Sequence, residues 1–301
     1  WSLAKGGFTS AEGFLASGVK AGFKHSGKED LALLVVPQDA ICAATFTQST
    51  VRASCVDLCE KRLSDSLGKV RAVLINSGQA NACTGSRGIS DNLNATKCLA
   101  KYLGLNSEKV LICSTGIIGK PIEMNKLYDS LELLVNKLNN EGGIHAAKAI
   151  LTTDLVEKEI AYEANLGGKI VRIGGMAKGS GMIHPNMATM LGFISCDAAL
   201  PFNIWEKMVK ESVNHSFNAI TVDGDTSTND SLLAFCSGEP LKEKYFQDLQ
   251  VGLKLTMQYL AKAIARDGEG ANCLLEVKVE GTSSTSDAFH IAKTVCGSSL
   301  V

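Results

Sequence analysis

A short stretch in the middle of the chain, KGSGMIHPNMATML (178–191), contains residue types that acyl-transfer chemistry uses. Among its glycines, methionines and alanine it carries Lys178, His184 and Thr189. A threonine just before an apolar run such as MLGFIS is ordinarily a packing residue, because a β-branched side chain suits the start of a buried strand. It acts as a nucleophile instead when the peptide bond before it is cut, since its own α-amine then becomes the general base.

The residue before Thr189 suits such a cleavage. Ala188 is small and leaves its carbonyl group accessible to the neighbouring hydroxyl. A freed α-amine has a pKa of about 7.7–8.0, so it accepts the hydroxyl proton near neutral pH. A nucleophile of this kind needs no histidine base, and we therefore interpret His184 as a packing or hydrogen-bonding residue.

Acyl transfer also requires donors for the oxyanion that develops on the attacked carbonyl. The segment STGIIG (114–119) follows the apolar run KVLIC and offers the hydroxyl of Thr115 and the backbone N–H of Gly116. The alternative is a plain turn from strand to helix, in which Pro121 opens the following helix.

Two other clusters suggest ligands that their spacing does not support. GGMAKGSG (174–181) lacks the order GxxxxGK[ST] of a phosphate loop, and His184 stands where a dinucleotide fingerprint needs a third glycine. VDGDTSTND (222–230) is rich in aspartate but lacks the glycine and the closing glutamate of an EF-hand at the positions that such a loop requires. Its side chains are expected to bond to local backbone and to support the site, with direct substrate contact as the alternative.

The elements that must position these residues are visible in the hydrophobic pattern. Short apolar runs predict strands buried on both faces, and residues 158–173 predict two strands around a glycine turn. One helix is predicted to begin after Ser90, which would cap it, with an apolar stripe near Leu93, Cys98, Leu99 and Tyr102. Another is predicted to begin at Pro121, which would lie in its first turn. We predict a mixed α/β layered fold with a soft division near the opening motif. The predicted strands are 31–36, 71–76, 109–113 and 274–280, and two further helices are predicted near 203–214 and 246–266.

The composition excludes several classes of function. The 301 residues are 45% hydrophobic and 20% charged with a net charge of −1, so the chain has no electrostatic footprint for nucleic acid or an anionic membrane. No apolar stretch approaches the roughly 20 residues that span a bilayer. The ten cysteines form no CxxC pair and the five histidines share no ligand spacing, so we expect no metal.

Segments along nearly the whole chain resemble the ornithine acetyltransferases, the self-cleaving glutamate N-acetyltransferases of arginine biosynthesis. The four residues ATML would be a weak match alone, but all of these segments occur in the order of that family. They are GFLASGVKAG (13–22), NSGQANACTG (76–85), CSTGIIGKP (113–121), AILTTD (149–154), KGSGMIHPNMATMLGFISCDAAL (178–200), FNAITVDGDTSTND (217–230) and RDGEGAN (266–272).

The resemblance implies a role for individual residues. Thr189 is the nucleophile, freed by self-cleavage after Ala188, and Thr115 with Gly116 forms the oxyanion hole. Without the resemblance, Lys178 would be a solvated surface lysine and Glu269 a loop charge at the end of a helix. The residues that the resemblance implies as substrate contacts are Thr152, Lys178, Thr189 and Glu269.

The resemblance also implies an αββα sandwich and an activity. Residues 1–188 would form one fragment with the oxyanion hole and residues 189–301 the other. The enzyme would move the acetyl group of N-acetylornithine to glutamate without metal or organic cofactor, and acetyl-CoA is a possible second donor. The fragments would form a heterodimer that pairs into a larger oligomer in the cytoplasm. The family continues past residue 301 into further pocket residues, so we expect the second fragment to be truncated.

Two alternatives remain open at the level of the sequence. An N-terminal-nucleophile aminopeptidase or amidase would use the same threonine ester with water in place of glutamate. A non-catalytic amino-acid-binding protein would keep the fold as a single uncut chain.

Overall fold

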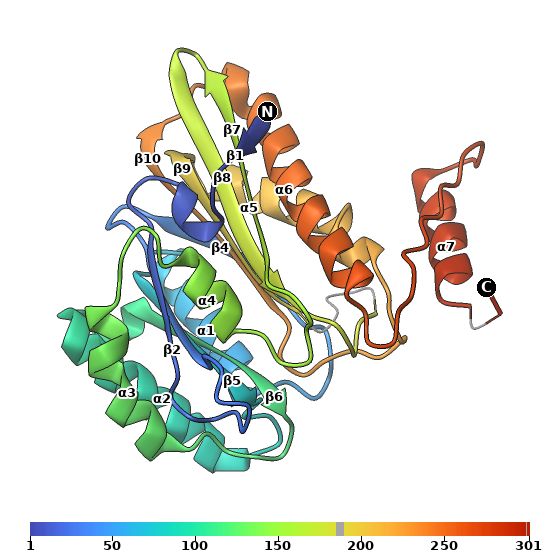
Figure 1. Ribbon diagram of the computed structural model, residues 1–301. Coiled ribbons are helices and arrows are strands. Elements are labelled where there is room, and N and C mark those ends of the chain that lie inside the picture. The colour runs from blue at the N-terminus through green and yellow to red at the C-terminus, as the bar shows by residue number, and fades with distance from the viewer. Residues whose placement is uncertain (185–189, 299) are drawn as a thin grey trace.

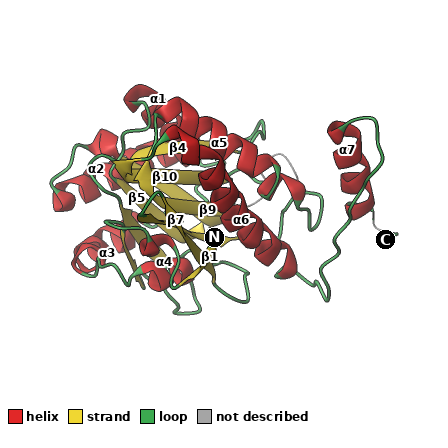
Figure 2. Ribbon diagram, turned by 90° about the horizontal axis from the view of Figure 1, so that it is seen from above, coloured by secondary structure: helices red, strands yellow, loops and turns green. Residues whose placement is uncertain are grey.

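The structure is a computed structural model that describes residues 1–184, 190–298 and 300–301. Two sheets stack face to face between layers of helices (Figures 1 and 2). The larger sheet has the order β1-β7-β8-β9-β10-β4 and the smaller one β2-β3-β5-β6. The strands are β1 (Ser2–Ala4), β2 (Leu15–Val19), β3 (Leu31–Val35), β4 (Ile41–Phe46), β5 (Ala72–Gln79), β6 (Val110–Ile117), β7 (Lys158–Leu166), β8 (Lys169–Lys178), β9 (Leu191–Ala199) and β10 (Ser231–Pro240).

Helices cover both outer faces and close the two open sides between the sheets. The helix pair α5 and α6 packs on the larger sheet and the pair α2 and α3 on the smaller one. The helices are α1 (Ser54–Ser66), α2 (Gly85–Leu103), α3 (Met124–Asn136), α4 (Gly143–Ala149), α5 (Phe202–Asn214), α6 (Phe246–Arg266) and α7 (Thr285–Cys296), and short 3-10 turns lie at Phe8–Ser10, Ser107–Lys109, Phe217–Ala219 and Glu243–Tyr245. The predicted αββα sandwich is therefore confirmed.

The central core lies between the two sheets. Ile75 and Leu111 of the smaller sheet meet Phe193 and Phe235 of the larger one, and all four are buried. Because successive side chains of a strand point to opposite faces, each central strand needs apolar residues at every position. That requirement explains why LALLV and AVLI show no alternation.

Most predicted elements agree with the structure. The segment 158–173 forms β7 and β8 around Gly167 and Gly168, and MLGFIS forms the start of β9. The helices predicted at 203–214 and 246–266 are α5 and α6.

Three predictions about helices and strands were wrong. Residues 274–280 form no strand, because their alternating pattern meets no partner strand in the described part of the chain. Ser90 lies inside α2, which begins at Gly85, and its supposed stripe fails because Leu93 and Tyr102 are exposed. Pro121 precedes α3 by three residues and is not in its first turn.

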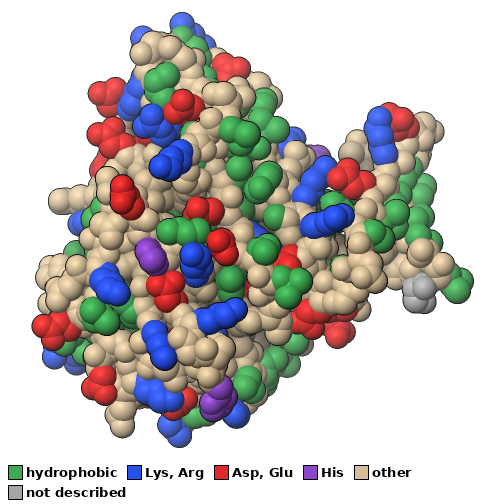
Figure 3. Space-filling view, in the orientation of Figure 1, with side chains coloured by type: hydrophobic (Ala, Val, Ile, Leu, Met, Phe, Trp, Pro, Cys, Tyr) green, Lys and Arg blue, Asp and Glu red, His purple; other side chains and the backbone are tan. Residues whose placement is uncertain are grey.

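The surface shows no single sign of charge. Figure 3 shows acidic and basic side chains interspersed over one face. Among the described residues, no helix is long and apolar enough to cross a membrane.

Candidate active site

The candidate residues converge at one end of the sandwich, where three strands of the larger sheet align. Pairing of β8 with β9 sets Lys178 beside Leu191, and pairing of β9 with β10 sets Leu191 beside Ser231. Lys178 thus ends β8 in the same row in which β9 and β10 begin. Ala188 and Thr189 lie outside the described residues, and Met190 is the first residue described after them.

The oxyanion candidates lie at the end of β6, which is an edge strand. The carbonyl oxygens of Val110, Ile112 and Ser114 all point to its open edge. They accept hydrogen bonds from Arg62 Nη1 (2.5 Å), Cys59 Sγ (3.1 Å) and Asn229 Nδ2 (2.9 Å) in turn.

Backbone groups alternate along a strand, so the N–H of Gly116 points to the same open edge. Ile117 points the other way, since its carbonyl accepts from Ala80 N at 3.0 Å. Within the described residues the Thr115 side chain makes no hydrogen bond, although the residue is only 6% exposed. An N–H and a hydroxyl are therefore both available at this strand end.

Position 116 requires glycine. Gly116 has φ +128°, and a Cβ there would lie 2.4 Å from the carbonyl carbon of Gly78. The two glycines face each other in register on β5 and β6. This close backbone approach explains why glycine occupies position 116, whose N–H is the predicted oxyanion donor.

Two consecutive residues connect β6 with the start of β9. Asn229 donates to the Ser114 carbonyl at 2.9 Å, and Asp230 Oδ1 accepts from the Met190 N–H at 2.9 Å. Burial raises the pKa of the Asp230 carboxyl well above its ordinary value. The residue after Thr189 is thereby tied to the strand that carries Thr115.

Lys178 is a buried cation with a hydroxyl partner. Its Nζ donates to Thr152 Oγ1 at 2.6 Å, and the residue is 3% exposed. Thr152 comes from the loop after α4, which Ser77 fixes to β5 through a 2.5 Å hydrogen bond to the Ala149 carbonyl. Thr152 and Lys178, which the resemblance implies as substrate contacts, are thus in direct contact with each other.

Glu269 lies against the same glycine-rich segment. Its N–H donates to the Ser180 carbonyl at 2.7 Å. Its exposed carboxylate packs on Gly181, where a Cβ would come within 2.7 Å of Glu269 Cδ. The segment 178–181 therefore carries the buried cation Lys178 and contacts the exposed anion Glu269.

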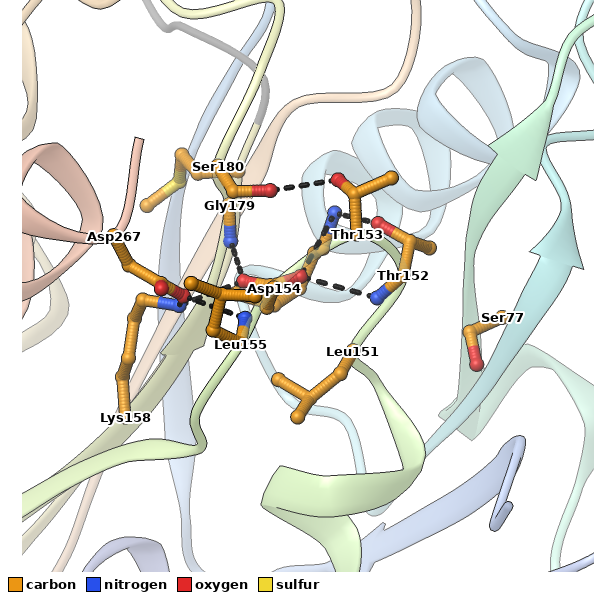
Figure 4. A network of polar contacts seen from close by, with 12 residues as sticks. Ser77, Leu151, Thr152, Thr153, Asp154, Leu155, Lys158, Gly179, Ser180 and Asp267 are labelled. Atoms are coloured by element: carbon orange, nitrogen blue, oxygen red, sulfur yellow. Dashed lines mark hydrogen bonds and ion pairs between the residues drawn. The ribbon is translucent and has the colours of Figure 1, made fainter. Parts of the chain in front are cut away.

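A network of buried charges is centred on Asp154 and includes Lys158 and Asp267 (Figure 4). Asp154 accepts from Lys158 Nζ at 2.8 Å and from Gly179 N at 2.7 Å, and Lys158 also reaches Asp267 at 2.5 Å. Burial alone would raise the pKa of Asp154, but Lys178 and Lys158 outweigh it and lower the pKa to about 2.

The aspartate-rich loop holds the backbone before the undescribed segment. Asp223 accepts from the N–H groups of Met182 and Ile183, the latter at 2.9 Å. His184 Nδ1 lies 3.3 Å from Thr221 Oγ1. These contacts agree with the structural role expected for 222–230 and with a hydrogen-bonding role for His184.

Sequence reasoning did not single out Asp154, Lys158, Asp267, Asn229 or Asp230. Spacing offered one signal, since Asp154 and Lys158 stand four residues apart, although no helix connects them. The described residues contain no group of three or more His, Cys, Asp or Glu side chains that could hold a metal ion.

Comparison with known proteins shows what the chain is similar to. The sequence profile of the ArgJ family matches residues 15–301. The "Arginine biosynthesis bifunctional protein ArgJ" of Prochlorococcus marinus is 63% identical over the whole chain, which spans 73% of that protein, and the protein of that name from Parasynechococcus marenigrum is 62% identical over the whole chain and 74% of its own length.

Two solved structures are informative. The ornithine acetyltransferase of Mycobacterium tuberculosis, solved in complex with ornithine, has a TM-score of 0.56 at 38% identity; the match covers 60% of this chain and 95% of that one. The L-aminopeptidase D-Ala-esterase/amidase of Ochrobactrum anthropi has a TM-score of 0.57 at 10% identity and covers 88% of both chains. The second likeness concerns the fold alone.

Proposed function

Because this chain belongs to the ArgJ family of arginine-biosynthesis acetyltransferases, we propose that it moves the acetyl group of N-acetylornithine to glutamate through Thr189. The Thr189 oxygen attacks the acetyl carbonyl, and the α-amine of Thr189 takes the hydroxyl proton. The amide C–N bond breaks, and that proton leaves with ornithine. The amine of glutamate then attacks the threonine ester, which gives N-acetylglutamate and restores the hydroxyl.

The contacts at the end of β6 support Thr115 and Gly116 as the oxyanion hole. The Gly116 N–H points to the strand edge at which Asn229 binds the Ser114 carbonyl. The next residue, Asp230, binds the N–H of Met190, the immediate neighbour of the proposed nucleophile. Donors fixed on a rigid strand need no reorganisation when charge develops on the carbonyl oxygen.

One observation supports this choice of substrate: a cation and an anion lie at the same short segment, residues 178–181. Lys178 offers an ammonium group beside the Thr152 hydroxyl, and Glu269 offers a carboxylate over Gly181. N-acetylornithine carries a carboxylate at one end and an ammonium group at the other. Charge-assisted hydrogen bonds to both ends would fix the α-carbon, which carries the acetylated nitrogen, and so orient the acetyl group.

The extent of the structural match supports cleavage between Ala188 and Thr189. The tuberculosis chain is matched almost completely yet accounts for 60% of this chain. Residues 1–188 are about 62% of the 301 residues, which is the share that a separate first fragment would have. We propose the division 1–188 and 189–301 on this ground, with the two fragments held together by β9 and β10 pairing into the larger sheet.

Product analysis tests the proposed function. The protein is incubated with N-acetylornithine alone, with N-acetylornithine plus glutamate, and with acetyl-CoA plus glutamate. We expect N-acetylglutamate only when glutamate is present, and its appearance in the third arm would add acetyl-CoA as a donor. Release of acetate at the same rate without glutamate would instead identify an amidase. Absence of both products would favour a binding protein.

Gly181 offers a test of the ammonium subsite. In Gly181→Ala the new methyl group would occupy the space of the Glu269 carboxylate, which can turn away because it ends a flexible side chain. Loss of one charge-assisted contact should raise the KM for N-acetylornithine by about tenfold or more. The KM for glutamate should change little, since glutamate brings no side-chain ammonium. Steady-state kinetics with each substrate varied measures both values.

The matched control is Gly297→Ala, at the end of α7, where the nearest atom to a new Cβ is 3.4 Å away. It should leave both KM values unchanged. An equal rise of both KM values in Gly181→Ala would contradict a selective role for Glu269.

A further inference from the structure

Four ionisable side chains lie buried together behind the proposed substrate site. The side chains of Asp154, Lys158, Lys178 and Asp267 are between 0% and 6% exposed. Burying a charge is costly unless it is paired, and here two lysines face two aspartates. The proposed mechanism uses only Lys178, so the other three need an explanation.

The charges are shared unevenly within the cluster. Asp154 Oδ1 is occupied by Lys158 Nζ at 2.8 Å and by the Gly179 N–H at 2.7 Å. Lys178 Nζ lies farther away, 3.7 Å from Asp154 Oδ2, and its one close partner among the described residues is Thr152 Oγ1 at 2.6 Å. An ammonium group has three donors, so Lys178 keeps donors for a carboxylate while Asp154 balances its charge.

The cluster also joins the two segments that carry the proposed substrate contacts. Asp154 Oδ2 accepts from the N–H of Thr152 at 3.0 Å. Asp267 accepts from Lys158 at 2.5 Å and from the Leu155 N–H at 3.1 Å. Asp267 stands two residues before Glu269, so a buried lysine connects the Thr152 loop with the Glu269 loop (Figure 4).

We propose that Asp154 is a positioning residue that holds Lys178 and Thr152 for the substrate carboxylate, and that Lys158, anchored by Asp267, occupies Asp154 so that Lys178 stays available. This inference rests on the proposed function, because it assigns Lys178 to a substrate carboxylate. The three residues act through Lys178 and Thr152 and do not touch the substrate.

The surrounding charges give the inference a signature in the pH profile. The pKa of Lys178 is lowered, first by burial and further by the neighbouring Lys158. The carboxylates of Asp154 and Asp230 act in the opposite direction and raise it. Lys24, which follows β2 and donates to the Leu151 carbonyl at 3.0 Å, is a further cation near Lys178. Lys178 binds a carboxylate only while protonated, so kcat/KM should fall as the pH rises through its pKa.

The first variant is Asp154→Asn, which keeps the shape of the side chain and removes its charge. The pKa of Lys178 should then drop, and the alkaline limb of kcat/KM for N-acetylornithine should move down by about one to three pH units. Asp154→Glu restores the charge and should move the limb back toward wild type. The control is Asp197→Asn, another buried carboxylate that accepts two backbone N–H groups, near the far end of β9, and it should leave the limb in place.

The second variant is Lys158→Met combined with Asp267→Asn, which removes one buried pair without changing the net charge. Among the described residues, Asp154 then keeps Lys178 as its one salt-bridge partner, so the limb should move to higher pH while the KM for N-acetylornithine rises. Opposite shifts in the two variants support the inference, and if one variant folds too poorly to assay, the expected shift in the other supports it. Uniformly lower activity with an unmoved limb in both would overturn it. Failure of the wild-type protein to transfer acetyl groups would refute the proposed function instead.

Discussion

Thr189→Ala is expected to remain a single chain of 31.8 kDa without acetyl transfer, whereas the wild-type protein is expected to separate into residues 1–188 and 189–301. Cleavage needs the Thr189 hydroxyl to attack the Ala188 carbonyl, which breaks the C–N bond and leaves an ester that water hydrolyses. Without the hydroxyl the cleavage cannot occur, and the later acyl-enzyme cannot form. Activity should fall by at least about four orders of magnitude. Intact mass and N-terminal sequencing measure the cleavage.

Two controls separate chemistry from folding. Thr189→Ser keeps a hydroxyl and, once cut, an α-amine, so it should still divide and retain activity. Thr96→Ala removes a buried threonine hydroxyl from α2. Among the described residues this hydroxyl bonds only to the backbone of its own helix, so the variant should divide like the wild type. A wild-type chain that is active but uncut would rule out the α-amine as general base.

The layers of this fold could be predicted from the sequence because a buried strand or helix needs apolar residues at a characteristic spacing. Leu31–Val35 and Ala72–Ile75 are apolar at every position, as strands between two layers must be. Helices α5 and α6 could be predicted because their buried residues recur at helical spacing. The segment 274–280 shows the limit of this reasoning, because alternation describes a strand only if a partner strand meets it.

The site divides in the same way. Thr115 and Gly116 could be proposed because a hydroxyl and a glycine N–H stand at the end of a buried strand, although the sequence also allowed a plain turn there. The lysine–aspartate cluster could not be predicted, since Asp154 and Asp267 are 113 residues apart and meet only through Lys158. Pairing of buried charges is decided by tertiary contacts, which local spacing does not encode.

The link between the two halves of the site was equally hidden in the sequence. Asn229 and Asp230 are adjacent, yet one binds the Ser114 carbonyl and the other the Met190 N–H. The loop was assigned a supporting role from its composition alone. The structure adds that the loop connects β6 with the start of β9.

Thr115→Val should lower kcat by about 10²–10³, or about 2.7–4 kcal/mol of transition-state stabilisation, with little change in KM. Valine has the shape of threonine and suits β6, so the 6% exposed position keeps its packing while the hydroxyl donor is lost. Both half-reactions pass through an oxyanion, so acetylation of Thr189 and transfer to glutamate should slow together. Single-turnover kinetics of each half-reaction measures this.

Thr45→Val is the matched control, because Thr45 lies on β4 and its buried hydroxyl has no hydrogen-bond partner among the described residues. The same change of atoms there should leave kcat unaltered. If Thr115→Val raised KM and left kcat intact, its hydroxyl would bind substrate and transition state equally, and the oxyanion would rest on the Gly116 N–H alone. A fall in kcat confined to one half-reaction would likewise contradict a shared oxyanion hole, since the same two donors face the carbonyl oxygen in both steps.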